Sequence, residues 1–413
     1  MKFTAAAIAL GATAALAQQS GSMSGGMSGG SMAPSASASG GMGGGMSGGN
    51  GTDYAATLIA ALSANNLTTL LGIAQQNAQT LLPLLQMGGN KTVFAPTDAA
   101  FAQLPENVTS NAQLVANTVL YHVYFGSYGV SQLSEMPTIA RSALNATDLV
   151  NLPGGQGQVA VLTRGSGNSS NVVVNQLTSN VTSVATAPVA NLIVHVIPQV
   201  LMVPGTLTET LSMANLTALT GALTSAAPEA VPMLEEARGI TVFAPNDQAF
   251  GNVQSLIGQL NQTAIANVLL NHVINGTVVY STQIENGSEQ VSAGGQPLRF
   301  MTNSTGAFVM SGNSTARIVR ANVPFANGVA HVIDGVLANP ASNPQAAASA
   351  ASSAASAAQT ATAAATGPVG GGTMTATGSA PSGSASQPAS GSTKVVAGGF
   401  LGAGIAAGLA LLA

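Results

Sequence analysis

Histidine and aspartate are the side chains of this sequence that could support metal binding or catalysis. The four histidines form two pairs, His122 with His195 and His272 with His331, whose members are 73 and 59 residues apart. Two or three imidazoles can contribute to a zinc site, but neither pair has a repeated acid or a cysteine beside it. The sequences VHVI and AHVI around the second histidine of each pair favour buried, hydrogen-bonded rings. We therefore expect structural histidines and predict no metal and no other cofactor.

Two aspartates, Asp98 and Asp247, lie at equivalent points of a repeated decapeptide. TVFAPTDAAF, residues 92–101, returns as TVFAPNDQAF, residues 241–250, with eight of its ten letters unchanged. Either aspartate could serve as a catalytic carboxylate, but each lacks a second acid or base at a useful spacing. The chain also has no cysteine, which excludes disulfides, thiolate zinc sites and cysteine nucleophiles. These observations predict that the protein is not an enzyme.

The decapeptide itself predicts the elements that position each aspartate. Residues 91–95 form a short β-branched and aromatic run, and Pro96 ends it because proline cannot donate a ladder hydrogen bond. Thr97, or Asn246 in the second copy, is a preferred helix N-cap, and the aspartate then lies in the first helical turn. The repeated residues thus predict the same strand-to-helix corner twice.

The remainder of the first copy also contains recognisable elements. Residues 111–120 have the pattern of an amphipathic helix, and an extended segment follows that ends at Gly126. Residues 158–176 form two strand-like runs around a Gly/Ser/Asn turn and predict a hairpin, while residues 191–197 are typical of a central strand. Early helices and late strands predict an α+β domain.

The duplication extends beyond the decapeptide. TLIAALSANNLT, residues 57–68, corresponds to TLTETLSMANLT, residues 206–217, and the same offset holds at the decapeptides. Similar matches follow near the end of each copy. We therefore predict two tandem domains, at residues 53–203 and 204–340.

Low-complexity segments flank the two predicted domains, and we expect them to be disordered. Residues 18–52 are Gly, Ser and Met with little else, which favours a flexible tether. Their methionines could bind Cu(I), but the composition favours the tether. Residues 341–390 are rich in Ala, Ser, Thr and Pro, and predict an extended O-glycosylated stalk, although the alanine-rich part could also be helical.

Both ends of the chain have the character of targeting signals. Residues 1–17 are typical of a secretory signal peptide that is cleaved after Ala17. Residues 391–413 are typical of the removed part of a glycosylphosphatidylinositol (GPI) anchor signal, with attachment at Ser390 or Gly391. The alternative is a transmembrane helix over the last 19 residues, but five glycines dilute that stretch.

The composition predicts a secreted glycoprotein. Of 413 residues, 46% are hydrophobic and 5% are charged, and the net charge is −4. Charged side chains alone are therefore too few to hydrate the surface. The sequence also has no cluster of basic residues of the kind that binds nucleic acid. Thirteen Asn-x-Ser/Thr sequons could carry N-linked glycans that hydrate the surface instead. They lie at Asn50, Asn66, Asn90, Asn107, Asn145, Asn168, Asn180, Asn215, Asn261, Asn275, Asn286, Asn303 and Asn313.

The repeated motifs resemble the fasciclin-like domain family. The resemblance rests on the two decapeptides, on YHVYFG and NHVING, and on VHVIPQVL and AHVIDGVL near the end of each copy. It implies two tandem domains, each a β-sandwich-like wedge with packed α-helices. It also implies extracellular modules of cell adhesion and cell-matrix contact, which are often GPI-anchored in fungi and plants. The composition and the targeting signals of this chain look fungal.

The resemblance also implies candidate binding residues. Some animal members of the family use a Tyr-His motif after the central helix for integrin contact, and the matching residues here are Tyr121 and His122. The second copy has Asn271 before His272, which weakens the transfer to that domain. Because integrin contact is an animal function, the partner itself cannot be carried over.

Together these features predict a glycoprotein that is GPI-anchored to the outer face of the plasma membrane, or held in the cell wall, and that acts through weak multivalent contacts of its two modules. Its expected partner is a cell-surface or cell-wall glycan or protein of unknown identity. Two alternatives stay open. One is a structural wall constituent without a specific partner, and the other, with less support, is a metal-binding protein.

Overall fold

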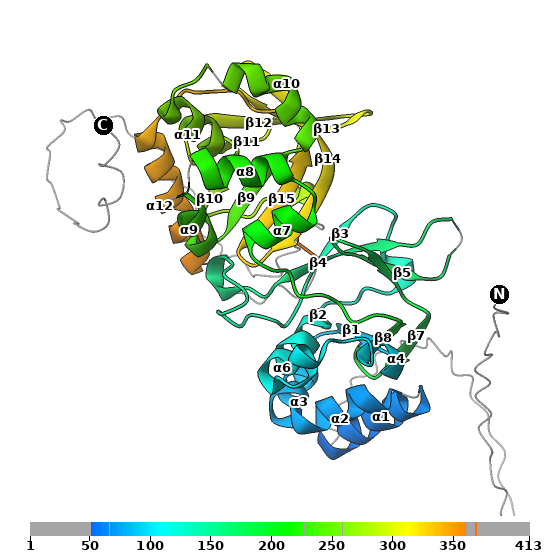
Figure 1. The fold of residues 1–413 in the computed structure, drawn as a ribbon. Coiled ribbons are helices and arrows are strands. Elements are labelled where there is room, and N and C mark those ends of the chain that lie inside the picture. Colours follow the sequence, from blue (N-terminus) through cyan, green and yellow to red (C-terminus); the bar gives the residue numbers. More distant parts are fainter. Residues whose placement is uncertain are drawn as a thin grey trace, which may run out of the picture. The chain divides into compact units, whose positions relative to one another are not determined.

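The computed structural model in Figure 1 describes residues 51–360 together with residues 368 and 369. Within the first range the described residues exclude Asn66, Asn168, Ala227, Glu229 and Gly258. The predicted signal peptide, most of the Gly/Ser/Met segment and the predicted anchor signal lie outside the described residues. Among the described helices, none combines the length and the apolar character that a membrane crossing requires.

The first repeat begins with helices and ends with strands. Its elements are α1 (Gly51–Ala64), α2 (Thr68–Gln76), α3 (Ala78–Gln86), β1 (Lys91–Pro96), α4 (Asp98–Phe101), α5 (Glu106–Thr109), α6 (Ala112–Tyr121), β2 (Val123–Phe125), η1 (Val130–Gln132), β3 (Thr138–Arg141), η2 (Pro153–Gly155), β4 (Val159–Arg164), β5 (Val172–Asn175), β6 (Asn180–Thr182), β7 (Ala185–Val189) and β8 (Leu192–Ile197). The short helices η1 and η2 are of the 3₁₀ type.

The second repeat follows the same order. Its elements are α7 (Leu207–Met213), α8 (Thr217–Ala226), α9 (Ala230–Glu236), β9 (Ile240–Pro245), α10 (Asp247–Ile257), α11 (Gln262–Leu270), β10 (Val273–Asn275), η3 (Ser281–Gln283), β11 (Glu289–Val291), β12 (Pro297–Asn303), β13 (Gly306–Ser311), β14 (Ser314–Phe325) and β15 (Gly328–Ile333), and α12 (Pro344–Thr360) comes after it. The predicted α+β class is confirmed, and so is the tandem repetition.

Both repeats are organised around three equivalent strands. β1 pairs in parallel with β8 and antiparallel with β2, and β9 pairs in the same way with β15 and β10. The last strand of each repeat therefore lies beside its first strand, which encloses the intervening chain in one domain. In the first repeat β3, β4, β5 and β6 form a separate sheet, whereas in the second repeat the long strand β14 joins both parts into a seven-stranded sheet.

Alternating side chains of these strands build two hydrophobic cores in each repeat. Phe94 packs with Tyr124 toward the separate sheet, whereas Ala95 packs with leucines of α1, α2 and α3 on the opposite face. The division follows from strand geometry, because successive side chains of a strand point to opposite faces of the sheet. Phe243 and Ala244 divide in the same way between the two cores of the second repeat.

The predicted strand-to-helix corner is present in both repeats. After β1, Thr97 Oγ1 accepts a hydrogen bond from the Ala100 backbone N–H at 3.3 Å. After β9, Asn246 Oδ1 accepts one from the Ala249 backbone N–H at 2.8 Å. The predicted central helix is α6, which Asn111 caps, and the predicted hairpin is the antiparallel pair of β4 and β5. These short-range predictions are confirmed.

The segment that follows the second repeat differs from the prediction. We expect an extended stalk over residues 341–390, yet the first part of this range forms the helix α12, which contacts η2 of the first repeat and β10 of the second (Figure 1). Alanine is the best helix former, and half-buried Ala346, Ala350 and Ala354 lie along one side of α12. Gly276 leaves room for the helix, because a Cβ atom there would lie 2.8 Å from the Cβ of Ala354.

The two repeats share a buried contact. An apolar cluster joins them, and its buried members are Ile139, Val159, Val161, Tyr280 and Val329. Beside this cluster, the buried Gln158 side chain donates from Nε2 to the Phe325 carbonyl at 3.0 Å. The Asn151 backbone N–H donates to the Ala326 carbonyl at 2.9 Å. The repeats are therefore packed against each other through buried residues.

We expect Gln158→Ala to lower the free energy of unfolding by about 1–3 kcal/mol, because it leaves the buried Phe325 carbonyl without its donor. Calorimetric melting of the full chain measures this loss. The matched control is Gln103→Ala, which removes an exposed side chain and should change the free energy of unfolding by less than about 0.5 kcal/mol. Equal melting of the wild-type chain and both variants would contradict the buried contact between the repeats.

Candidate functional site

The structure places the predicted binding residues inside the domains. The exposed fractions of these residues are 2% for Tyr121, 2% for His122, 0% for Asn271 and 4% for His272. None of the four side chains can touch a partner unless its domain opens locally. The direct partner contact that the family resemblance implies at these positions does not fit their burial, and their hydrogen bonds give them an internal role.

His122 connects the end of α6 to the chain segment that follows β8, the last strand of the first repeat. Its Nδ1–H donates to the Thr118 carbonyl at 2.7 Å, and its Nε2 accepts from the Leu201 backbone N–H at 2.9 Å. Because a backbone N–H can only donate, the ring proton is assigned to Nδ1. The ring therefore connects a helix end to the chain just beyond β8, the last strand of the repeat.

His272 makes the same two bonds in the second repeat. Its Nδ1–H donates to the Val268 carbonyl at 2.7 Å, and its Nε2 accepts from the Leu337 backbone N–H at 2.9 Å. Burial lowers the pKa of both His122 and His272 to about 4. Both rings are therefore neutral near neutral pH, which is the protonation state that these two bonds require.

The other two histidines stack on Phe94 and Phe243, each of which belongs to a hydrophobic core of its repeat. His195 stacks on Phe94 with the ring centroids 5.2 Å apart, and His331 stacks on Phe243 at 5.5 Å. Their Nε2–H groups donate to backbone carbonyls at 3.0 and 2.8 Å. Burial lowers the pKa of both rings, to about 4 for His331. The expectation of buried, hydrogen-bonded histidines is confirmed. Within the part of the chain that the structure describes, no three His, Asp or Glu side chains gather as metal ligands would.

The two repeated aspartates cap a helix that begins about thirty residues earlier in the chain. Asp98 Oδ2 accepts from Thr68 Oγ1 at 2.5 Å, and its Oδ1 accepts from the Thr69 backbone N–H at 2.8 Å, at the start of α2. Asp247 holds the start of α8 through Thr217 in the same way. The threonine hydroxyl bonds are the largest cause of a lowered pKa at both aspartates. The local sequence pattern predicts only that each aspartate lies in the first turn of the helix that follows its strand. The repeated Asn-Leu-Thr triplet is the signal that could have revealed that the aspartate also caps an earlier helix.

The two copies differ at the residue before the helix-end histidine. Tyr121 donates from its hydroxyl to the Val159 carbonyl at 3.1 Å. Asn271 instead donates from Nδ2 to the carbonyls of Asn339 and Ala341, at 2.9 and 2.8 Å. Asn271 therefore fastens the segment that leads from β15 to α12. The departure from the Tyr-His motif in the second copy thus corresponds to a different internal partner.

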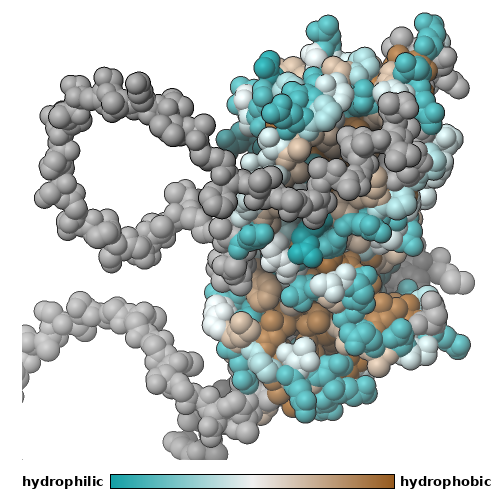
Figure 2. All heavy atoms as spheres, turned by 90° about the vertical axis from the view of Figure 1, so that its left-hand side faces the viewer, coloured by the Kyte–Doolittle hydropathy of each residue, from teal (hydrophilic) through white to brown (hydrophobic). Residues whose placement is uncertain are grey.

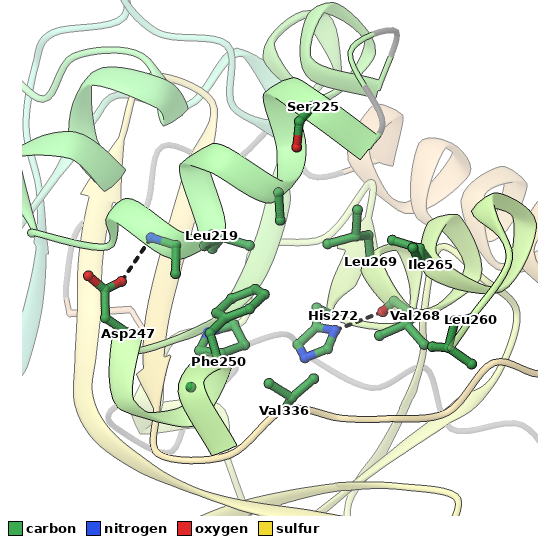
Figure 3. Close-up of a pocket in the computed structure, with 14 residues that line it drawn as sticks. Leu219, Ser225, Asp247, Phe250, Leu260, Ile265, Val268, Leu269, His272 and Val336 are labelled. Atoms are coloured by element: carbon green, nitrogen blue, oxygen red, sulfur yellow. Dashed lines mark hydrogen bonds between the residues drawn. The ribbon is translucent and has the colours of Figure 1, made fainter. Parts of the chain in front are cut away.

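A cavity of about 490 Å³ lies beside His272 in the second repeat (Figure 3). Side chains of α8, α10 and α11 form its walls, among them Ala222 of α8, Phe250 of α10 and Leu269 of α11. Sequence reasoning missed this cavity. The available signal was that the first copy has Ile73, a much larger residue, at the position of Ala222.

Comparison with known protein families agrees with this architecture. The family model of the fasciclin domain matches residues 65–204 and residues 214–339, one match in each repeat. The chain belongs to the fasciclin domain family.

Two similar proteins are fungal. The fasciclin-like arabinogalactan protein of Arthroderma benhamiae is 27% identical over 265 residues, which cover 62% of this chain and 60% of that protein. A fasciclin-like arabinogalactan protein of Cercospora beticola is 24% identical over 266 residues, which cover 62% of this chain and 70% of that protein. A solved fasciclin domain pair from the insect cell adhesion molecule fasciclin I is 16% identical, covers 67% of this chain and 97% of that chain, and has a TM-score of 0.34.

The free energy of unfolding should fall when the pH is lowered from about 6.5 to about 4. Folding lowers the pKa of His272 from 6.5 to about 4, so in this interval the unfolded chain binds a proton that the folded chain does not. In His272→Gln this contribution should vanish, and the loss at about pH 7.5 should be about 1–3 kcal/mol because two buried partners lose their bonds. Urea unfolding at several pH values measures both effects. A variant that keeps the full wild-type pH dependence would contradict the assignment.

Asp247→Ala should lower the free energy of unfolding by about 0.5–2 kcal/mol, the usual cost of losing a helix cap. Thr217→Val removes the same hydroxyl bond, so the double variant should lose less than the sum of the two single losses. Asp148→Ala, at an exposed turn, is the control and should have little effect. Urea unfolding of the four variants tests the coupling, and strictly additive losses would show that the two residues do not cooperate.

Proposed function

We propose that this protein is a cell-surface glycoprotein that makes adhesive contacts through its pair of fasciclin domains, and that it acts by binding and not by catalysis. The membership of both repeats in the fasciclin domain family carries the proposal. The names of the fungal relatives, fasciclin-like arabinogalactan proteins, support an extracellular location. The repeated histidines and aspartates are engaged in internal hydrogen bonds, so they serve the fold and not a reaction.

The exposure of the sequons supports a glycosylated surface. Of 25 asparagines with described side chains, nine belong to sequons and all nine are exposed, whereas only three of the other sixteen are exposed. Sequons that arose by chance would share the burial of the other asparagines, so the difference favours sites that carry sugar. The nine are Asn90, Asn145, Asn180, Asn215, Asn261, Asn275, Asn286, Asn303 and Asn313.

The described surface also has exposed apolar side chains that could make weak contacts. Figure 2 shows one face on which apolar patches lie between hydrophilic residues. Exposed large apolar side chains include Met87, Met136, Val184 and Met233. Apolar patches of this kind are typical of protein contact surfaces. Because the two domains pack against each other, they would present their contact surfaces as a fixed pair, and many copies on one cell would add avidity. The partner would be a glycan or protein of a neighbouring cell surface or wall.

Attachment through a lipid anchor is part of the proposal. The predicted anchor signal, residues 391–413, lies outside the described residues. Val369 pairs with Ile139 of β3, so Ser390 lies only 21 positions beyond the packed part of the chain. Even fully extended, this length spans no more than about 75 Å. The domains would therefore stay closer to the cell surface than a stalk beginning at residue 341 would allow.

Deletion of the gene in the source organism tests the proposed function. Cells without the protein should adhere to one another and to surfaces several-fold less, and the wild-type gene should restore adhesion. A variant that lacks residues 391–413 should be secreted into the medium and fail to restore it. Unchanged adhesion of the deletion cells would contradict the proposed function. Release by a phosphatidylinositol phospholipase supports membrane anchorage, whereas release by glucanase alone would make the protein a wall constituent.

A further inference from the structure

We propose that the second repeat holds one molecule of an uncharged, mainly apolar compound in the cavity between α8, α10 and α11. The cavity volume of about 490 Å³ lies within the roughly 300–1,000 Å³ that small-molecule sites occupy. Figure 3 shows side chains from all three helices around it, with Leu219 on α8, Phe250 on α10 and Ile265 on α11. Such binding is independent of the proposed adhesive contacts.

The polar groups at this cavity already have internal partners. Ser225 Oγ donates to the Gly221 carbonyl at 2.6 Å, and both ring nitrogens of His272 are engaged. Asp247 accepts two hydrogen bonds from the start of α8. Aliphatic and aromatic side chains supply most of the lining that remains, which favours an apolar ligand.

The charges at the cavity exclude an ionic ligand. The described lining residues include no lysine or arginine, so an anion would find no counter-charge and would meet the carboxylate of Asp247. A cation would find that same carboxylate already engaged in capping α8. Burying an unpaired charge is costly. The ligand that this lining fits is therefore neutral, such as an uncharged aromatic or isoprenoid molecule.

The first repeat has larger side chains at two of the positions that line the cavity of the second repeat. Ile73, at the position of Ala222, packs against the helical core of the first repeat. Ala102 stands at the position of Gly251, and α4 ends at Phe101 where α10 continues to Ile257. Both repeats share the same three central strands, histidine bonds and aspartate caps. The fold therefore does not require the small residues Ala222 and Gly251, which line the cavity of the second repeat.

An empty cavity in this position would reduce stability. Apolar side chains around a void lose contacts that a filled core provides, and this loss grows with the cavity volume. Phe250 is only half-buried, whereas its counterpart Phe101 is buried in a filled core. A bound apolar molecule would restore the missing contacts to Phe250 and its neighbours. The same contacts would make the bound protein more stable to heat.

Titration of the full chain with N-phenyl-1-naphthylamine, an uncharged fluorescent probe, tests the site. The wild-type protein should bind one probe saturably, and the probe should raise its melting temperature. Ala222→Ile installs the residue of the first repeat and should weaken binding about tenfold or more, because the larger side chain occupies part of the cavity. Thr224→Ile installs the same side chain on the exposed side of the same helix, and should keep the wild-type affinity.

A second variant keeps the test decisive if Ala222→Ile does not fold. A Cβ atom at Gly251 would meet no other atom within 4 Å, and leucine favours a helix over glycine, so Gly251→Leu should fold and also weaken binding. The absence of saturable probe binding to the wild type would overturn the proposal. So would wild-type affinity in the folded cavity variants, or an equal loss in Thr224→Ile, because the probe would then bind elsewhere.

Discussion

A neutral histidine at the end of the central helix holds each fasciclin domain closed. His122 and His272 each join the last turn of that helix to the backbone just beyond the final strand. The final strand pairs with the first strand of the repeat, and closing so long a loop costs conformational entropy. Because the chain has no cysteine, hydrogen bonds and core packing must hold this closure without a disulfide. The caps, cores and loops of each domain are arranged around it.

The two repeats show which parts of this design can change. Buried backbone groups must keep a hydrogen-bond partner, and the histidine bonds that supply one are the same in both copies. The aspartate caps, at exposed helix starts, also recur in both copies. Apolar contacts and the hydrogen-bond partners of individual side chains differ between the two copies. Tyr121 reaches strand β4, whereas Asn271 fastens the segment before α12. Ile73 fills a core, whereas Ala222 borders a cavity. One architecture therefore accommodates different side-chain packing at the same place in its two copies.

This division has consequences for function. The repeated histidines and aspartates make hydrogen bonds that hold the fold, so the proposed functions rest on the outer surface, where the sequons lie, and on the cavity of the second repeat. The buried contact between the repeats fixes one domain against the other. The docked helix α12 contacts both repeats and adds to this connection. This connection supports the proposed function, in which two packed domains contact a partner together and many copies on one cell add avidity.

The repeated local structure can be predicted from the residues alone, because proline, caps and apolar spacing act within a few positions. The corner at Thr97, the central helix and the hairpin of β4 and β5 follow from such signals. Four other features are visible only in the folded chain: Asp98 caps α2, Tyr121 and His122 are buried, α12 docks on the domains, and a cavity lies beside His272. Each of these features depends on atoms that are far apart in the chain, and no local pattern specifies which distant atoms will meet.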